Sequence, residues 1–435
     1  MASSSFSPLR LVVRLILPAL ALIAGILYGG WGYHKHKFPF DGSIPALASS
    51  SVRNTTTRFK PPSQHKRVQD TSDVKNLEDL GYAEGTEAAT EETGVTTYIP
   101  EIAEDGVNLC ISAHGEEAYL MDMEGKVLHE WKYDLAAELE SEDAAVLKRR
   151  FRKAHLYPDG GLAVVYGGHA WLARFDKDSK LLWKLKSGFH HDLEVQPDGT
   201  IYAIGSASHV NDKINKKKPV IEDYIVQISA DGEELRRVAV LEALQNSVYA
   251  PLLQQMPAFG DIFHSNTIEV LKKPHANAPA SWKEGQVMIS IREMDVVAVI
   301  DMDEASVVWA MTGIWDGQHQ PTVLDNGNIL VFDNFGTGMS NVYEINPGTQ
   351  DIVWAYRGNA SNDFYSETCG SNMRLANGNT LITESDSGRA FEVTPDGITA
   401  WRYVNPHTVG EGSEMVATLF EVTRYPREYV AAWLK

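Results

Sequence analysis

The sequence predicts an all-β fold, a six-bladed β-propeller with an N-terminal transmembrane helix and a flexible tether. Three observations lead to it: a hairpin pattern that recurs six times, a Trp at the end of five of the six copies, and an uncharged apolar stretch near the N-terminus. We expect residues 1–37 to be a cytoplasmic stub and membrane anchor, residues 38–104 a disordered linker, and residues 105–435 the propeller.

The anchor is predicted from residues 15–33, which carry no charged side chain. About 19 residues at roughly 1.5 Å each can cross a bilayer core of about 30 Å. A cleaved signal peptide is the alternative, but the small-residue site at residues 19–21 comes too early to leave a normal apolar stretch before it. Two arginines precede the stretch and two lysines follow it, so loop charge only weakly favours a cytoplasmic N-terminus. We expect a single-pass membrane protein with its propeller on the extracytoplasmic side, periplasmic or extracellular.

The linker is predicted from its composition, which is rich in Ser, Thr and Pro and then in Glu. Residues 1–75 hold 10 Lys and Arg against 3 Asp and Glu, which leaves 29 against 55 and a net charge of −26 for the rest. Such an acidic globular part disfavours a nucleic-acid partner. Two cysteines, Cys110 and Cys369, allow one disulfide at most and predict no disulfide framework.

The blades are predicted from hairpins in which alternating apolar residues flank a short turn of Asp, Asn and Gly. Six outer hairpins end at Trp131, Trp183, Val238, Trp309, Trp354 and Trp401. A second, inner hairpin with an Asp-Gly or Asn-Gly turn precedes most of them, and two hairpins make a four-stranded blade. Two β-sandwiches would also show short strands, but they would not explain a Trp that returns at the same place. We expect this Trp to pack between neighbouring blades.

Two insertions interrupt the repeat. Residues 135–154 have the best helical pattern and are expected as a helix between the first and second blades. Residues 241–263 lengthen the connection to the fourth blade. Insertions of this kind usually lie on one face of a propeller and shape the site there.

Histidines recur just before the innermost strands of the predicted blades, at His155, His190, His191, His264 and His319. Equivalent positions in a propeller converge on one axial mouth, where imidazoles suit nucleophilic or acid–base chemistry or metal binding. His191 and His319 align best, since each lies eight residues before a turn glycine, whereas His155 lacks this offset and is expected to be structural. Each histidine could instead satisfy backbone groups at the start of a strand.

A metal site is not predicted. His190, His191 and Asp192 form the one close ligand group, but adjacent strand residues point to opposite faces. No cofactor is predicted either. Arg292 follows the strand expected to pair with the His264 strand, where its guanidinium could hold an anionic group or form a surface ion pair with Glu293 or Asp295.

Several segments together resemble the aryl-sulfate sulfotransferase family: DIFHSNTIEVL, ISIREMDVVAVIDMDEASVVW, QHQPTVLDNGNILVFDN, MRLANGNTLITESDSGRAFEVTPDGITAWRYVNP and LFEVTRYPREY. The resemblance covers roughly residues 105 to 430. It implies a six-bladed propeller that transfers a sulfuryl group from a phenolic sulfate ester to another phenol, without a nucleotide sulfate donor, through a sulfo-histidine. A small aromatic or sulfated substrate is the partner that it implies.

Residue by residue, His264 matches an HxN motif that includes Asn266, His319 matches a QH motif, and Arg292 matches an SxR pattern. The resemblance therefore implies catalytic roles for His264 and His319, with His191 as a third lining histidine. It implies substrate-binding roles for Arg292, Asn266 and Asn334.

The chain departs from the family at two places. After the FDN segment that ends at Asn334 it reads FGTGMSN, where the family tends to place an Arg, and the late blade reads SETCGSN without a His. The covalent nucleophile therefore has no counterpart at a matching motif, and His407 and Cys369 are alternatives from neighbouring loops. A non-catalytic propeller that binds a ligand or protein at its axial mouth remains the alternative function. A quinone-dependent dehydrogenase fits less well, because those propellers favour eight blades. The oligomeric state is not predicted.

Overall fold

The structure is a computed structural model that describes residues 85–139, 148–168, 170–273, 276–336, 338–358 and 363–434. The predicted anchor at residues 15–33 and most of the predicted linker lie outside these ranges. Across the ranges that are described, no helix has both the length and the apolar character needed to span a bilayer.

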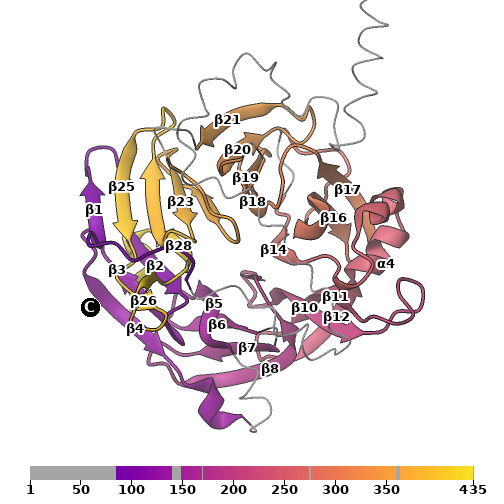
Figure 1. Cartoon of the computed structure of the whole chain (residues 1–435), viewed down its shortest axis with the longest axis horizontal. Helices are drawn as coiled ribbons and strands as arrows, with labels where there is room; N and C mark the ends of the chain where they lie inside the picture. Colours follow the sequence, from indigo (N-terminus) through magenta and orange to yellow (C-terminus); the bar gives the residue numbers. More distant parts are fainter. Residues whose placement is uncertain are drawn as a thin grey trace, which may run out of the picture. The chain divides into compact units, whose positions relative to one another are not determined.

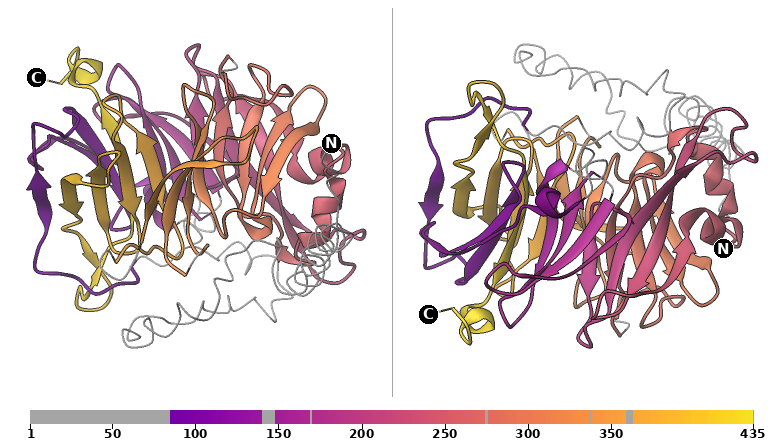
Figure 2. Two further views of the ribbon diagram at one scale, coloured as in Figure 1. Left: turned by 90° about the horizontal axis from the view of Figure 1, so that it is seen from above. Right: turned by 90° about the horizontal axis from the view of Figure 1, so that it is seen from below.

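Six antiparallel sheets of four principal strands each surround one axis, which confirms the predicted six-bladed propeller (Figure 1). Side views show the strands running along that axis (Figure 2). The first blade contains β28 (Leu419–Tyr425), β2 (Val107–Ser112), β3 (Glu117–Met121) and β4 (Val127–Lys132). The second contains β5 (Lys148–Leu156), β6 (Leu162–Gly167), β7 (Ala170–Phe175) and β8 (Leu181–Phe189). The third contains β9 (Leu193–Val195), β10 (Ile201–His209), β11 (Val220–Ile228) and β12 (Glu234–Ala239), with β13 (Gly260–Asp261) added beside β11.

The other three blades follow in chain order. The fourth contains β14 (Ser265–Val270), β15 (Val287–Ile291), β16 (Val296–Asp301) and β17 (Ser306–Thr312). The fifth contains β18 (His319–Val323), β19 (Ile329–Asp333), β20 (Asn341–Ile345) and β21 (Ile352–Arg357). The sixth contains β22 (Ser371–Arg374), β23 (Thr380–Glu384), β24 (Arg389–Val393) and β25 (Thr399–Val404), with β1 (Gly94–Tyr98) at its outer edge.

Short helices and one extra hairpin complete the described part. The helices are η1 (Leu135–Glu138), α4 (Val240–Gln245), η2 (Ala250–Gln255), η3 (Arg292–Met294) and α5 (Arg427–Val430). The hairpin is formed by β26 (Thr408–Val409) and β27 (Met415–Val416).

The core is divided into six apolar clusters, one between each pair of neighbouring blades. Strand β19 shows how alternation feeds two of them. Ile329 and Val331 pack toward the fourth blade, whereas Leu330 and Phe332 pack toward the sixth. Successive strand residues point to opposite faces, so each blade covers an apolar face of both neighbours.

The tryptophans at the ends of the outer hairpins join neighbouring blades, as predicted. The indole N–H of Trp131 donates to the carbonyl of Gly160 in the second blade at 2.9 Å, and that of Trp401 donates to Met123 in the first blade at 2.9 Å. Trp183 and Trp354 make the corresponding bonds, at 3.0 and 2.8 Å. Each ring thus covers apolar surface while its polar N–H satisfies a turn carbonyl of the next blade.

The ring closes through both ends of the described chain. Strand β28, from the C-terminal part, is the innermost strand of the first blade and pairs with β2. Strand β1 pairs with β25 at the outer edge of the sixth blade. Strand β1 lies within residues 38–104, the segment predicted as linker, so the propeller begins before the predicted boundary between linker and propeller. Backbone pairing and apolar contact at Val95 and Tyr98 order this strand despite its Thr- and Gly-rich sequence.

One further expectation is wrong, and one open question is answered. Residues 148–154, predicted as the end of a helix, belong to strand β5 and pair with β6, while the first residues of that segment form only the short η1. Cys110 and Cys369 are both buried and free, so no disulfide joins them. The second insertion forms α4 and η2, whose apolar residues pack beside the fourth blade.

Carboxylates on the innermost strands connect successive blades near the axis. Asp192 accepts from the backbone N–H of Ile268 at 3.0 Å, Glu269 accepts from Val323 at 2.9 Å, and Glu194 accepts from Val270. Burial raises the pKa of Glu194 to about 7 and, with the nearby charge of Glu194, that of Glu269 to about 8.

These shifts predict that the protein loses stability as the pH rises. The pKa of Glu269 is raised from 4.5 to about 8 in the folded state, so the folded protein holds the proton more tightly than the unfolded chain. This stabilisation is complete below about pH 4.5 and is lost as the pH rises through about 8. We expect Glu269→Gln, which keeps the acceptor but cannot ionise, to reduce the fall in unfolding free energy between about pH 5 and pH 8 by at least about 1 kcal/mol.

Urea unfolding at several pH values measures this effect. Glu130→Gln is the matched control, since Glu130 is 52% exposed on β4. An equal pH dependence in the wild type and Glu269→Gln would contradict the prediction.

Candidate functional site

The candidate site is formed where the innermost strands of the third, fourth and fifth blades begin. His191 and His264 precede β9 and β14 and have left-handed backbone conformations, with φ of 58° and 48°. In the fifth blade the left-handed residue is Gln320, with φ 48°, and not His319. His319 therefore corresponds to His190, and the equal spacing of His191 and His319 to their turn glycines is misleading. A β-bulge between His319 and Thr322 accounts for this shift of one residue in the fifth blade.

His319 is buried, with 3% of its surface exposed, and its ring is held from one side. Its Nδ1 lies 2.8 Å from Oδ1 of Asn334 and 3.0 Å from the carbonyl of Gly317. The amide of Asn334 cannot turn around, because its Nδ2 donates to the carbonyls of Ser366 and Cys369 at 2.7 and 3.0 Å. Both partners of Nδ1 are acceptors, so the proton of the neutral ring is on Nδ1 and the lone pair is on Nε2. Within the described residues, this Nε2 has no hydrogen-bond partner.

The protonation state of His319 follows from its surroundings. Burial holds its pKa well below the ordinary value, and the positive charges of Arg292 and Arg152 lower it further. His319 is consequently a neutral imidazole at physiological pH. The same positive charges can attract an anionic substrate to this ring.

The other two predicted histidines lie together. The rings of His191 and His264 are 4.8 Å apart at a steep angle. Nδ1 of His264 is 2.7 Å from Oδ2 of Asp261, so the carboxylate orients this ring and directs Nε2 away from itself. His191 contacts His190 through their Nδ1 atoms, and Nε2 of His190 lies 3.3 Å from Oδ1 of Asp223. The structure therefore brings His191, His264 and His319 to one face, with Asp261 behind His264 and Asp223 behind His190, which contacts His191.

The two predicted asparagines have protein partners at both polar ends. Asn266 donates to the carbonyl of Gln318 at 2.8 Å and accepts from the hydroxyl of Thr267. Asn334 is engaged on both sides, as described above. Asn266 therefore fixes the backbone next to His319, and Asn334 fixes its ring. Neither asparagine directs an unpaired polar atom toward a substrate. Asn372 of the sixth blade adds to this support, since it donates to the carbonyl of Gln320 at 3.0 Å.

Arg292 lies where the sequence predicts it, at the end of β15. It is buried, with 7% of its surface exposed, and its Nη1 is 2.9 Å from Glu293. The predicted pair with Glu293 and the proximity to His319 are thus both present. Arg152 of β5 is a further cationic residue here, and it was not predicted from the sequence. Its Nη2 is 3.7 Å from Sγ of Cys369, and its guanidinium stacks on the Phe420 ring at 4.7 Å.

Three other candidates take different places. His155 lies on β5 against Tyr157, with ring centroids 5.1 Å apart, and does not begin the strand. Cys369 is close to the site through Arg152 and Asn334, but burial raises the pKa of its thiol, which therefore stays protonated. His407 is stacked on His114 at a centroid distance of 3.6 Å, in a separate cluster. Cys369 therefore borders the axial site as a protonated thiol, and His407 lies outside it.

Solved structures related to the chain share little sequence with it. A crystal structure of a protein of unknown function from Bacteroides caccae is 13% identical, covers 73% of this chain and 98% of its own, and has a TM-score of 0.47. A streptogramin B lyase is 12% identical over 79% of this chain and 98% of its own, with a TM-score of 0.44. An inactive virginiamycin B lyase from Staphylococcus aureus with quinupristin is 11% identical over 72% and 89%, with a TM-score of 0.40. None of them bears on the function of this chain.

No curated relative matches the chain. A family model, described as Arylsulfotransferase (ASST), matches residues 156–406, which are more than half of the 435 residues and run from the second blade through the sixth. His191, His264, Arg292 and His319 all lie within the matched range. The resemblance drawn from the sequence motifs is confirmed, and the chain belongs to the arylsulfotransferase family.

Proposed function

We propose that this protein transfers a sulfuryl group from a phenolic sulfate ester to a phenol, with His319 as the nucleophile. The observation that carries the proposal is the state of His319: a buried, neutral ring with Nδ1 held by Asn334 and a lone pair on Nε2 that has no hydrogen-bond partner within the described residues. A neutral imidazole held in one orientation is what nucleophilic attack on sulfur requires.

In the first step, Nε2 of His319 attacks the sulfur of the aryl sulfate. The N–S bond forms as the bond between sulfur and the phenolic oxygen breaks, and the electron pair of that bond leaves with the phenolate. His264 is the candidate proton donor to the phenolate, because Asp261 at 2.7 Å orients its ring beside that of His191 at the same site. Arg292 and Arg152 supply positive charge beside the sulfate oxygens, where they stabilise the charge of the transition state.

In the second step, an acceptor phenol gives its proton to His264 and attacks the sulfur of the sulfo-histidine. The O–S bond forms, the N–S bond breaks, and its electron pair returns to Nε2 of His319. The hydrogen bond to Asn334 holds the Nδ1 proton through both steps, so the ring returns to its starting tautomer. Asn334 and Asn266 act as positioning residues in this scheme, and His191 supports His264.

The test is a double-displacement assay on the full chain. A chromogenic aryl sulfate is incubated with the protein at varied concentrations of a phenol acceptor, and phenolate release is followed. We expect acceptor-dependent release with parallel double-reciprocal lines, and one sulfuryl group on the peptide that contains His319 after a quench without acceptor. A modified peptide elsewhere would exclude His319 as the nucleophile. The absence of acceptor-dependent release would favour the alternative, a propeller that only binds its ligand.

We also infer that residues 15–33 anchor the protein in a membrane, with the propeller on the extracytoplasmic side. Support comes from the sequence, because these residues carry no charged side chain. They lie outside the described part of the chain, which begins at residue 85. We expect the full chain to sediment with membranes and to resist extraction by high salt. Protease added to the extracytoplasmic side should release a soluble propeller. Protection of the propeller from that protease would overturn the orientation, and a supernatant protein would overturn the anchor.

A further inference from the structure

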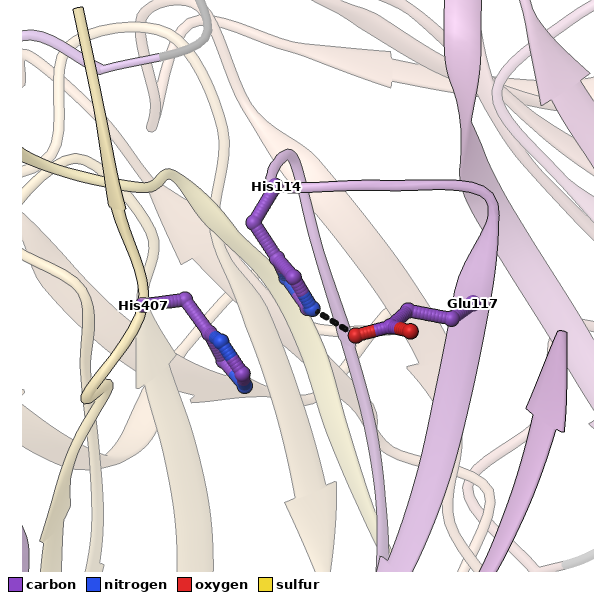
Figure 3. A group of neighbouring side chains, drawn as sticks. All are labelled: His114, Glu117 and His407. Atoms are coloured by element: carbon purple, nitrogen blue, oxygen red, sulfur yellow. Dashed lines mark hydrogen bonds and ion pairs between the residues drawn. The ribbon is translucent and has the colours of Figure 1, made fainter.

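A second histidine cluster lies at the seam where the ring of blades closes (Figure 3). His114 lies in the turn after β2, Glu117 is the first residue of β3, and His407 lies between β25 and β26. The ring closes next to this cluster, where Ser112 at the end of β2 pairs with Leu419 at the start of β28. The cluster therefore joins the first blade to the C-terminal segment that leads into the closing strand.

The three side chains already hold metal-ligand atoms close together. One ligand atom from each lies within 4.8 Å of the other two, and within the described ranges no other three His, Cys, Asp or Glu residues are grouped in this way. Nε2 of His114 is hydrogen-bonded to Oε1 of Glu117. The ring of His407 is stacked on that of His114, with centroids 3.6 Å apart and planes 2° from parallel. Figure 3 shows the His114 ring pointing at the Glu117 carboxylate, with the His407 ring next to that of His114.

Neighbouring groups fix which atoms face the centre of the cluster. Ser112 Oγ is hydrogen-bonded to Nδ1 of His114, so Nε2 is the nitrogen that faces Glu117. Nζ of Lys132 is 2.8 Å from Oε2 of Glu117, so the other oxygen, Oε1, faces His114. A hydroxyl can donate or accept, and Ser112 can therefore support His114 in either tautomer. Such outer partners are typical of histidines that bind metals.

His407 is available as the third ligand. Its ring is in contact with His114 and Tyr119, and in the described part of the chain no hydrogen bond to its ring nitrogens is found. A neutral imidazole has one nitrogen with a lone pair, which is what a metal ion needs from this ring.

We propose that His114, Glu117 and His407 bind one divalent transition-metal ion of the Zn²⁺ type, with a fourth position open to water. Two imidazole nitrogens and one carboxylate oxygen form a ligand set that suits Zn²⁺ and does not suit Ca²⁺ or Mg²⁺, which prefer oxygen ligands. The ion takes the place of the proton that Nε2 of His114 donates to Glu117, and that proton moves to Nδ1, where Ser112 Oγ accepts it.

Binding requires a small adjustment of the cluster. An ion lies in the plane of each imidazole that binds it, and two parallel planes do not meet. One ring must therefore turn about its Cβ–Cγ bond, and His407, held here by ring contacts, is the one to move. Tetrahedral bonds of about 2.0–2.1 Å bring ligand atoms to roughly 3.3 Å from each other, so the present separations need only a modest contraction.

The bound ion would link the first blade to the segment that closes the ring. His114 and Glu117 lie beside the first blade's strand β2, and His407 belongs to the segment between the sixth blade and β28. An ion held by both parts binds only when β28 has closed the ring, so it stabilises the folded state.

The test uses the full chain without a polyhistidine tag, stripped of metal and then titrated with Zn²⁺ in a calorimeter. We expect one equivalent to bind, and the melting temperature to rise with Zn²⁺ concentration. His407→Ala should weaken binding by at least about 100-fold, because loss of an outer partner alone costs about 10–100-fold. Glu117→Gln, which keeps the shape of the side chain, should weaken it as well. Co²⁺ in place of Zn²⁺ should give the absorption of a tetrahedral site.

His155→Ala is the matched control, since His155 is a half-buried histidine on the second blade that contacts Tyr157. It should bind Zn²⁺ like the wild type. Circular dichroism and the melting temperature without metal establish that each variant is folded. One-equivalent binding that is unchanged in both His407→Ala and Glu117→Gln would overturn the site, as would binding no tighter in the wild type than in His407→Ala.

Discussion

Replacing His319 with Ala is expected to abolish sulfuryl transfer while the propeller stays folded. The variant loses the atom that forms the covalent bond, and we expect kcat/KM for an aryl sulfate to fall by about 10⁴-fold or more, the scale found when a covalent nucleophile is removed. Among the described residues, the side chain makes hydrogen bonds only through Nδ1, to Asn334 and Gly317, so its loss should not disrupt the strand pairing of β18. Phenolate release and circular dichroism measure the two outcomes separately.

His155→Ala is the control for this measurement as well, because His155 does not lie with the axial histidines. If His319→Ala keeps more than about one-tenth of the wild-type kcat/KM, His319 is not the nucleophile. Asn334→Asp separates positioning from catalysis. A carboxylate beside Nδ1 favours the imidazolium and raises the pKa of His319, so the acid limb of the kcat/KM profile should move to higher pH. A purely structural role for Asn334 would leave that limb in place.

Removing Arg424 is expected to cause the largest loss of stability of any single substitution considered. Arg424 lies on β28 and is 3% exposed, and its Nη1 is 2.6 Å from Glu392, which is fully buried on β24. Its Nε donates to Asn108 of β2 at 2.7 Å, and its guanidinium lies 5.0 Å from the Trp401 ring. Arg424→Ala leaves the Glu392 carboxylate buried without its charge partner, which typically costs about 3–5 kcal/mol. Urea unfolding of the full chain measures this loss.

Arg427→Ala is the matched control. Arg427 pairs with Asp105 at 2.8 Å, but the two side chains are 49% and 63% exposed, and pairs of this kind contribute about 0–1 kcal/mol. Adding Glu392→Gln to Arg424→Ala should restore part of the stability, because no uncompensated charge remains. Equal losses for Arg424→Ala and Arg427→Ala would show that the buried pair does not hold the seam together.

The blade count could be predicted because each hairpin carries its own local signal. The turns at Gly199 and Gly327 have φ of 87° and 85°, which glycine adopts without strain, and each follows an Asp or Asn as hairpin turns prefer. Strand β5 could not be predicted in the same way. Its sequence KRRFRKAHL is rich in residues with high helix propensity, and only its pairing with β6 makes it a strand. This error also concealed Arg152.

The site was predicted only in part, because its members are brought together by neighbouring blades. His264, His319 and Arg292 could be found from motifs that surround them in the sequence. Asp223 and Arg152 carry no such signal, since their roles depend on side chains of other blades. The roles of Asn266 and Asn334 depend on bonds to Gln318, Ser366 and Cys369 that no spacing reveals. The same holds for the second cluster, because His407 lies 290 residues after Glu117 in the sequence.

The closing strand has a consequence for biosynthesis. Strand β4 ends at Lys132 and β28 begins at Leu419, so roughly 290 residues are translated between the outer part of the first blade and its innermost strand. At about 5–20 residues per second, the wait is about 15 to 60 seconds. During this time β2, whose six residues are all buried in the final fold, has an unpaired edge that can pair with other chains. The inner edge of the first blade therefore stays open until translation reaches β28, and the apolar face of β2 is covered only when the ring closes.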